Sequence, residues 1–202
     1  MDAAINRRRW ADRDGEFSPT YYAHLGPNDV SRRLVELLDR HVDREAAILE
    51  LGCSAGRHLA NLLEHGYEDL HGVDINDESF AVMAEYFPAL ADRGSFHATA
   101  IERFAPQRAD GEFDVVYSVQ TLQHVHEDDA WVFEELARIT GQLLVTVENE
   151  GDGEGSEDVR YVDEDLPLYV RDWEAIFTDF GFEQVEVQTG TYDTMRMFER
   201  AD

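Results

Sequence analysis

Short apolar runs alternate with segments of helical spacing along most of this chain. Apolar runs of roughly four to eight residues are typical of buried strands, and they occur at residues 46–51, 70–75, 95–98, 113–119 and 143–147. Between them, apolar residues recur every three or four positions, which indicates helices with one buried face. These segments lie at residues 30–42, 59–63, 80–87, 131–139 and 173–180.

Capping and turn residues mark the ends of the predicted helices. Asn28 or Asp29 precedes the first helix, where its side chain can accept a free N–H group of the first turn. Gly66 and Gly181 follow two other helices at the position that favours a left-handed residue. Pro88 ends a further helix, because proline disfavours the helical conformation in the residue before it.

This alternation predicts an α/β fold. Near-continuous apolar strands indicate a parallel sheet covered on both faces. After the last helix, residues 182–187 and 192–198 read as two strands joined by residues 188–191. A parallel crossover needs about a dozen residues, so these two strands run antiparallel. We therefore predict a Rossmann-like sheet of seven strands, mostly parallel with an antiparallel last strand, and helices on both faces. Ligands of such sheets bind beyond the carboxyl ends of the strands.

Composition limits the partners of such a protein. The chain has 202 residues and a formal net charge of −27, with 44 acidic residues against 17 basic ones, all of them arginine. A cationic nucleic-acid-binding module and a basic membrane-surface helix are therefore not indicated. We find no apolar stretch of membrane-spanning length and no signal-peptide core. The single cysteine allows no internal disulfide, so we expect a cytoplasmic protein.

The acidic residues are spread over the whole sequence, with one denser segment at residues 148–165. A hydrophobic fraction of 43% and an aromatic fraction of 11% suffice for a packed core, so the acidity does not indicate disorder. At molar salt the Debye length is about 3 Å, and repulsion between such charges nearly vanishes. Excess carboxylates with arginine in place of lysine resemble the proteins of salt-in halophilic organisms. The alternative is an acidic interaction surface, which would be confined to one segment.

The strongest chemical signal is the sequence ELGCSAGR at residues 50–57, after the first predicted strand. Small residues let such a turn pass close to a ligand before a helix begins. A dinucleotide-binding turn needs glycines at 52, 54 and 57, and this chain has serine and arginine at the last two. Asp74 follows the second strand roughly 20 residues later, where a carboxylate can accept both hydroxyls of a ribose.

The spacing of Glu50, Gly52 and Gly56 resembles the first motif of class I S-adenosylmethionine-dependent methyltransferases. Ser54 replaces the middle glycine, which changes little if Ser54 takes a negative φ, because its side chain is small. The resemblance continues through GVDIN at 72–76, ATAIE at 98–102 and FDVVYSVQTLQHV at 113–125. It also extends to the helix and turn at residues 173–182.

The resemblance implies S-adenosylmethionine as cofactor, S-adenosylhomocysteine as product and no metal. It places Glu50 near the methionine end of the cofactor, Asp74 on the ribose and Ile75 on the adenine. It also places the end of the fourth strand beside the methionine part and the sulfonium. The implied cofactor-binding residues are Glu50, Gly52, Cys53, Ser54, Gly56, Asp74, Ile75, Ala100, Ile101, Ser118 and Val119.

Methyl transfer requires few side chains, because most of the catalysis can come from holding the nucleophile in line with the methyl group. His124, just beyond the fourth strand, is the candidate catalytic base, since imidazole titrates near neutral pH. Alternatively, His124 caps or packs against the following helix. Glu148, Asn149 and Glu150 read as loop acids without a metal. The candidate substrate-binding residues are Tyr21, Tyr22, Gln120 and Arg160.

We predict a single domain over residues 1–202. Its parts are an N-terminal arm and helix (1–45), a cofactor-binding core (46–148), an acidic loop (149–170), and a C-terminal helix with two strands (171–202). The predicted activity is methyl transfer to an O, N or C nucleophile of a small molecule. Two alternatives stay open: a methyltransferase acting on tRNA or protein, and a non-catalytic module that binds S-adenosylmethionine. Neither the acceptor nor the oligomeric state can be deduced.

Overall fold

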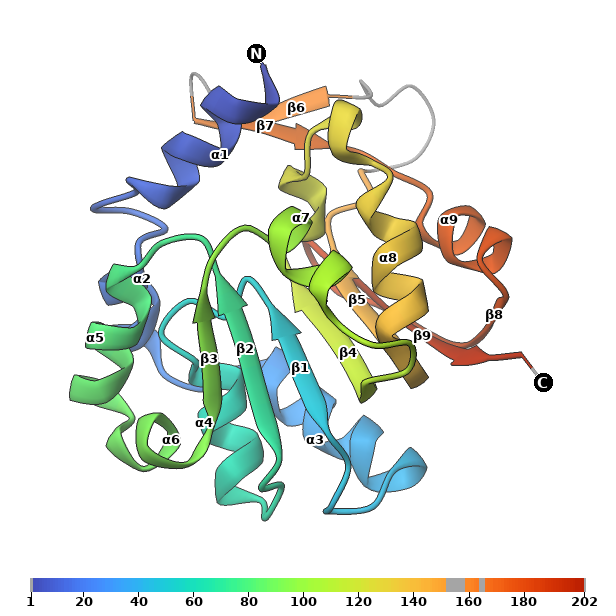
Figure 1. Ribbon diagram of the computed structural model, residues 1–202, viewed down its shortest axis with the longest axis horizontal. Coiled ribbons are helices and arrows are strands. Elements are labelled where there is room, and N and C mark those ends of the chain that lie inside the picture. The colour runs from blue at the N-terminus through green and yellow to red at the C-terminus, as the bar shows by residue number, and fades with distance from the viewer. Residues whose placement is uncertain (1, 152–158, 164–165, 202) are drawn as a thin grey trace. The chain divides into compact units, whose positions relative to one another are not determined.

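The computed structural model describes residues 2–151, 159–163 and 166–201 (Figure 1). Seven strands form one sheet in the order β3-β2-β1-β4-β5-β9-β8, with helices around it. Pairing is parallel between β1 and β2, β2 and β3, and β4 and β5, whereas β9 is antiparallel to both β5 and β8. The predicted fold class, with its antiparallel last strand, is confirmed.

The chain divides into two compact units, which are Trp10–Phe104 and the combination of Met1–Arg9 with Ala105–Asp202. The first is called the N-terminal unit below, and the second the C-terminal unit. No observation tests the single-domain prediction, so it stays a prediction.

The N-terminal unit contains three parallel strands and the helices that connect them. The strands are β1 (Ile48–Leu51), β2 (Leu70–Asp74) and β3 (Ser95–Ala98). The helices are α2 (Pro19–Leu25), α3 (Asp29–His41), α4 (Arg57–Glu64), α5 (Glu78–Tyr86), α6 (Pro88–Arg93) and α7 (Ile101–Phe104). Its core is made of fully buried aliphatic side chains such as Leu34, Ile48, Leu59 and Val73.

The helix ends in this unit follow the predicted chemistry. Asn28 caps α3 through its side chain, which accepts the N–H of Ser31, while the Ser31 hydroxyl accepts the N–H of Asn28. Gly66, just after α4, has a φ of +92°. Pro88 ends α5 as predicted, but it also begins α6, a helix that we did not predict. Proline is favourable at a first helical position, where no N–H bond is lost.

The C-terminal unit contains β4 (Phe113–Val119), β5 (Thr140–Glu148), β8 (Phe182–Thr189) and β9 (Thr194–Arg200). Its helices are α8 (Val132–Ile139) and α9 (Trp173–Asp179), together with the short 3₁₀ turns η1 (Ala105–Gln107), η2 (Leu122–His124) and η3 (Glu127–Asp129). Helix α1 (Ala3–Ala11) begins in this unit. Trp173 and Phe177 stack with ring centroids 6.2 Å apart and pack against Phe133 and Phe198.

The acidic segment is more ordered than predicted. β6 (Val159–Asp163) and β7 (Leu166–Tyr169) pair antiparallel as a separate two-stranded sheet, with Arg160 opposite Leu168. The prediction of a loop over residues 149–170 is therefore wrong for these strands. The segment Leu166–Tyr169 is buried, but it is short and follows a run of acidic residues and glycines that is typical of an exposed loop. Residues 152–158 and 164–165 of the predicted loop lie outside the described residues.

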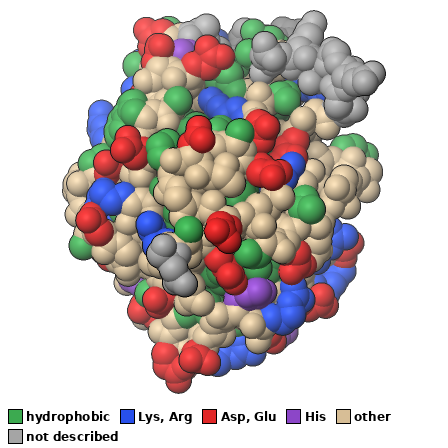
Figure 2. Space-filling view, turned by 90° about the vertical axis from the view of Figure 1, so that its right-hand side faces the viewer, with side chains coloured by type: hydrophobic (Ala, Val, Ile, Leu, Met, Phe, Trp, Pro, Cys, Tyr) green, Lys and Arg blue, Asp and Glu red, His purple; other side chains and the backbone are tan. Residues whose placement is uncertain are grey.

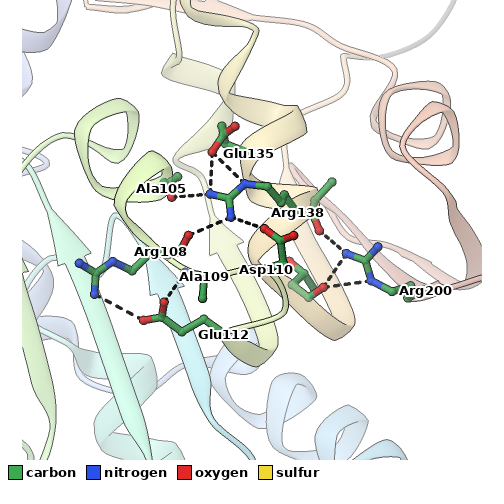
Figure 3. Close-up of polar contacts among 10 residues, drawn as sticks. Ala105, Arg108, Ala109, Asp110, Glu112, Glu135, Arg138 and Arg200 are labelled. Carbon is green, nitrogen blue, oxygen red and sulfur yellow. Dashed lines mark hydrogen bonds and ion pairs between the residues drawn. The ribbon is translucent and has the colours of Figure 1, made fainter.

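Arginine makes contacts in the C-terminal unit that lysine cannot match. The Arg138 guanidinium donates to the carbonyls of Ala105 (3.0 Å) and Arg108 (2.8 Å) and pairs with Glu135 and Asp110, each at 2.7 Å (Figure 3). Arg200 donates to the Thr140 carbonyl at 2.6 Å. A guanidinium carries five donors in a rigid fork, whereas an ammonium has three. The exclusive use of arginine thus has a local structural role.

Acidic side chains are dispersed over the face shown in Figure 2, among apolar and arginine side chains. Within the described part of the chain, the buried acidic side chains are Glu50, 2% exposed, and Glu148, fully buried. Burying a carboxylate is costly unless it is hydrogen-bonded or paired. Glu50 and Glu148, one in each unit, are therefore candidate functional residues.

Candidate active site

The glycine turn, residues 50–57, connects β1 to α4 in the N-terminal unit. Gly52 and Gly56 have φ values of +66° and +80°, a region that glycine enters without steric cost. The N–H groups of Gly52 and Cys53 both donate to the Val73 carbonyl, at 2.8 and 3.1 Å. The turn is thereby fixed against the end of β2, which carries Asp74.

Ser54 does not have the negative φ that would make the change from glycine unimportant. Its φ is +49°, in the left-handed region. A left-handed conformation costs a non-glycine residue about 1–2 kcal/mol. The conformation directs the Ser54 N–H to Asp74 Oδ2 at 2.8 Å. A charge-assisted bond of this kind offsets the strain.

Asp74 is held by two backbone donors, one on each carboxylate oxygen. Oδ2 accepts the N–H of Ser54, and Oδ1 accepts the N–H of Asn76 at 2.8 Å. Burial raises the pKa of Asp74, while these two bonds and the Ser79 hydroxyl lower it. Each oxygen keeps a further lone pair, so the half-buried carboxylate can still accept two hydroxyl groups. This chemistry fits the vicinal diol of a ribose.

Most N–H groups of the glycine turn are not available to bind a diphosphate. The N–H groups of Gly52, Cys53 and Ser54 are donated within the unit, and that of Gly56 donates to the Cys53 carbonyl at 2.8 Å. A dinucleotide-binding turn needs such N–H groups to face the pyrophosphate. The geometry therefore favours a nucleoside that lacks a diphosphate.

The other predicted cofactor residues of this unit have different surroundings. Ile75 is half-buried directly after Asp74, and Ala100 and Ile101 are buried at the start of α7. The Cys53 side chain is buried against Gly72, where an added Cβ would lie 2.7 Å from the sulfur. Burial raises the pKa of the Cys53 thiol well above its usual value. Cys53 thus has a packing role, with its backbone shaping the turn.

The N-terminal arm folds as a helix near the glycine turn. Tyr21 and Tyr22 lie on α2, and the Arg57 guanidinium lies over the Tyr22 ring, 4.9 Å from its centroid. The Asn76 side chain donates to the Arg13 carbonyl at 3.0 Å. Tyr21 is 38% exposed. The arm is thus attached beside both the turn and the end of β2, as expected for a segment next to a ligand.

In the C-terminal unit, Glu148 organises the end of β4. Its carboxylate accepts the Ser118 hydroxyl at 2.6 Å and the N–H groups of Thr121, Leu122 and Gln123 at 3.1–3.3 Å. Burial raises the pKa of Glu148 to about 7, although all four bonds lower it. The interpretation of Glu148 as a loop acid is wrong, since it is the last residue of β5. The available signal was its position directly after residues 143–147, five buried positions of that strand.

His124 is fixed by neighbours on both ring nitrogens. Nδ1 lies 3.1 Å from the Pro167 carbonyl, which only accepts, so Nδ1 carries the proton. Nε2 lies 3.2 Å from Gln123 Nε2. Burial lowers the pKa of His124 to about 4, with the Arg171 charge acting in the same direction. These contacts favour the packing role for His124 over the alternative of a base.

The remaining predicted residues lie at separate places in this unit. Val119 ends β4 and is half-buried. Gln120, with a φ of +51°, donates its side-chain amide to both oxygens of Asp193, at 2.8 and 3.0 Å. Arg160 is half-buried on β6. Arg171, which contacts the Leu122 and Val125 carbonyls and the Tyr169 ring, is a structural residue of η2 and its surroundings.

The sequence pattern predicts no role for Arg57, because position 57 stands out only as a place where a dinucleotide-binding turn would have glycine. It is half-buried, and burial lowers its pKa against the effects of Tyr22 and Glu50. Across residues 2–151, 159–163 and 166–201, no group of three His, Cys, Asp or Glu side chains is arranged to hold a metal ion. In the same residues, no helix has the length and apolar character needed to cross a membrane.

Comparisons with known proteins agree with this geometry. Residues 48–142 match the family model of the methyltransferase domain. A tRNA U34 carboxymethyltransferase from Idiomarina loihiensis is 30% identical over 112 residues, which are 52% of this chain and 34% of that protein. The chain thus spans about a third of the length of this curated relative.

Solved structures show the same fold at low sequence identity. The 1,6-didemethyltoxoflavin-N1-methyltransferase of Burkholderia thailandensis, with 1,6-didemethyltoxoflavin and S-adenosylhomocysteine bound, is 18% identical, with a TM-score of 0.67 over 99% of this chain and 84% of that chain. The magnesium protoporphyrin IX methyltransferase of Synechocystis PCC 6803, with S-adenosylmethionine bound, is 16% identical, with a TM-score of 0.64 over 99% and 92%. Residues 48–142 thus match a methyltransferase domain, and the solved structures share the predicted Rossmann-like fold.

Proposed function

Because residues 48–142 match a methyltransferase domain, we propose that the protein transfers a methyl group from S-adenosylmethionine to a small molecule. One observation carries the proposal. Asp74, positioned by Ser54 and Asn76, offers two acceptor oxygens at the end of β2, beside a turn in which four N–H groups, those of residues 52–54 and 56, already donate within the protein. That arrangement suits an adenosine without a diphosphate.

The residues of the N-terminal unit fit the other parts of this cofactor. Gly52, Ser54 and Gly56 shape the turn, Asp74 accepts the ribose hydroxyls, and Ile75, Ala100 and Ile101 offer apolar surface to the adenine. Buried Glu50, at the end of β1, is the acceptor for the α-ammonium group. When bound, the cofactor supplies a methyl group already activated by a sulfonium.

In the C-terminal unit, hydrogen bonds fix the backbone and the His124 ring that follow β4. Glu148 and Ser118 fix the backbone of residues 121–123, and Gln123 and Pro167 fix the His124 ring. We assign His124 a positioning role. Catalysis then rests on proximity and orientation, which suffice for a nucleophile that is already deprotonated. Asp193 engages Gln120, the residue proposed to orient the acceptor.

Two observations support a small acceptor. The arm presents an aromatic group, in which Tyr21 packs edge-on against Phe17 and Tyr22, with centroids 5.9 and 5.3 Å apart. Such rings suit a planar or apolar molecule. Both structural neighbours act on planar ring systems according to their names, a toxoflavin precursor and a protoporphyrin. Tyr21, Tyr22 and Arg160 are the proposed substrate-binding residues.

A second candidate acceptor is tRNA, because the relative from Idiomarina loihiensis acts on it. The net charge of −27 opposes binding to a phosphate backbone in dilute buffer. A methyl-labelling assay distinguishes the two. The protein is incubated in molar KCl with labelled S-adenosylmethionine and with separated metabolites, RNA or protein from a lysate. Label in the metabolite fraction supports the proposal, and label only in RNA or protein overturns it.

Cofactor binding is tested separately by calorimetry. Asp74→Asn is expected to weaken S-adenosylhomocysteine binding by roughly 10- to 100-fold, about 1.4–2.7 kcal/mol. The matched control is Asp77→Asn, since exposed Asp77 makes no capping bond with its side chain. Full affinity in Asp74→Asn, or binding of NADH but not of S-adenosylmethionine, contradicts the site.

We also propose adaptation to concentrated salt and a cytoplasmic location. The dispersed acidic side chains and the absence of lysine support the first, and the single, buried cysteine supports the second.

A further inference from the structure

Arg57 is the first residue of α4 and differs from the other half-buried arginines of this protein. Arg138, Arg171 and Arg196 each donate to carbonyl or carboxylate oxygens. Among the residues that the structure describes, the Arg57 guanidinium makes neither a hydrogen bond nor an ion pair, and its contact is the Tyr22 ring at 4.9 Å. The guanidinium donors are therefore not used by the described part of the protein and are available to a ligand.

The position of Arg57 points to the charge of that ligand. Glu50 and Arg57 stand at the two ends of the glycine turn, and their charges interact although no ion pair joins them. The Glu50 carboxylate is buried, 2% exposed. A negative and a positive group, held apart beside one turn, match a ligand that carries an ammonium and a carboxylate on the same carbon.

We propose that Arg57 binds the α-carboxylate of the amino-acid part of the cofactor, opposite Glu50, which takes the α-ammonium group. This inference rests on the proposed function. The same turn then serves two parts of the cofactor. Ser54 positions Asp74 for the ribose, and Glu50 and Arg57 bind the amino-acid part. Tyr22 stacks on the guanidinium and restricts its orientation, so the arm contributes to cofactor binding.

Two ligands separate this role from a structural one. S-adenosylhomocysteine carries the amino acid, whereas 5′-deoxy-5′-methylthioadenosine keeps the nucleoside and the thioether without it. Calorimetry on Arg57→Gln is expected to show a loss of about 10- to 100-fold for the first ligand. Affinity for the second is expected to stay within about twofold of wild type, since the nucleoside contacts are intact. Arg57→Lys is expected to give an intermediate loss, because it keeps the charge but not the fork.

Arg44 provides a matched control in the same unit. Its guanidinium also stacks on a tyrosine, 4.2 Å from the Tyr67 centroid, but it pairs with Asp39 at 2.6 Å. Arg44→Gln is expected to leave both affinities unchanged. A thermal midpoint for each variant checks that it folds.

The decarboxylated form of S-adenosylhomocysteine makes the test independent of folding defects. Wild type is expected to bind it about tenfold or more weakly than the parent ligand, and Arg57→Gln to show no such preference. Equal loss of both ligands in Arg57→Gln, unchanged affinity for S-adenosylhomocysteine, or no preference in wild type overturns the assignment. Failure of wild type to bind either thioether instead overturns the proposed function.

Discussion

The Ser118 hydroxyl donates to Glu148 Oε1 at 2.6 Å, and both side chains are buried at the ends of neighbouring strands. The same carboxylate accepts three N–H groups of residues 121–123. One buried acid thus determines the backbone path that leaves β4. The contribution of its bond with Ser118 to the free energy of unfolding can be measured with a side-chain substitution.

Ser118→Ala is expected to lower the free energy of unfolding by about 1.5–3 kcal/mol, the usual cost of removing a hydrogen bond to a buried charged group. Thr146, which pairs with Ser118 in the β4–β5 register, is the matched control. Its buried hydroxyl has no hydrogen-bond partner in the described part of the chain. Thr146→Val is therefore expected to leave stability unchanged or raise it, because it removes a buried hydroxyl that makes no hydrogen bond. Urea unfolding in molar KCl measures both, and equal effects would contradict the role of Glu148.

Buried His58 is expected to make stability depend on pH. Burial, with a smaller effect of Arg57, lowers its pKa to about 3, and its Nδ1 lies 2.8 Å from the Ser31 hydroxyl. The folded-state pKa of His58 lies below the unfolded value of 6.5. The contribution of the neutral ring to the free energy of unfolding is therefore fully present above pH 6.5 and is lost as pH falls toward 3. Each pH unit in that window costs about 1.4 kcal/mol.

His58→Gln should remove that part of the pH dependence, as measured by unfolding at several values between pH 4 and pH 8. His124 acts in the same direction, since its folded-state pKa is also lowered. Glu148 acts oppositely, because a raised folded-state pKa stabilises below the unfolded value of 4.5 and loses that effect as pH rises through about 7. An unaltered pH dependence in His58→Gln would show that His58 is not buried as a neutral ring.

Ser54→Gly is expected to raise the free energy of unfolding by up to about 1 kcal/mol. Glycine relieves the strain of a φ of +49°, and the larger entropy of the unfolded chain offsets part of the gain. Ser54→Ala keeps the strain and serves as the control. Thermal unfolding of both variants compares them, and a destabilised glycine variant would mean that the serine side chain is needed.

Stability is expected to rise steeply with salt. A net charge of −27 repels itself in dilute buffer, and molar KCl screens that repulsion. The thermal midpoint should therefore increase between about 0.1 and 3 M KCl, as followed by circular dichroism. Sucrose is the control, because it favours compact states without screening charge. An equal response to sucrose would argue against charge repulsion as the cause.

The regular part of the fold was predictable because local patterns and tertiary contacts agree. The strands at residues 95–98 and 113–119 have the predicted bounds. In the second, the apolar residues at 113 and 115–117 are also buried, whereas residues 95–98 are half-buried or exposed. Asn28 and Gly181 mark helix ends through local bonds and a positive φ. Helix α1, with three consecutive arginines and no apolar period, gave no such signal.

The candidate site was predictable where it depends on backbone spacing, and less so where it depends on side-chain surroundings. The spacing led to Asp74 and the glycine turn. The φ of Ser54 depends on a bond to a residue 20 positions away, and the importance of Glu148 depends on donors that follow another strand. Contacts between distant residues of this kind leave no mark in local sequence.

The burial of Cys53 against Gly72 also makes the protein suitable for spectroscopic labelling. Its one thiol is inaccessible, and burial keeps it protonated, hence unreactive toward maleimides. A cysteine introduced at an exposed position, such as Tyr192 at 78% exposure, would be the single reactive site. One fluorophore attached there can follow the unfolding of the protein without first removing a native cysteine.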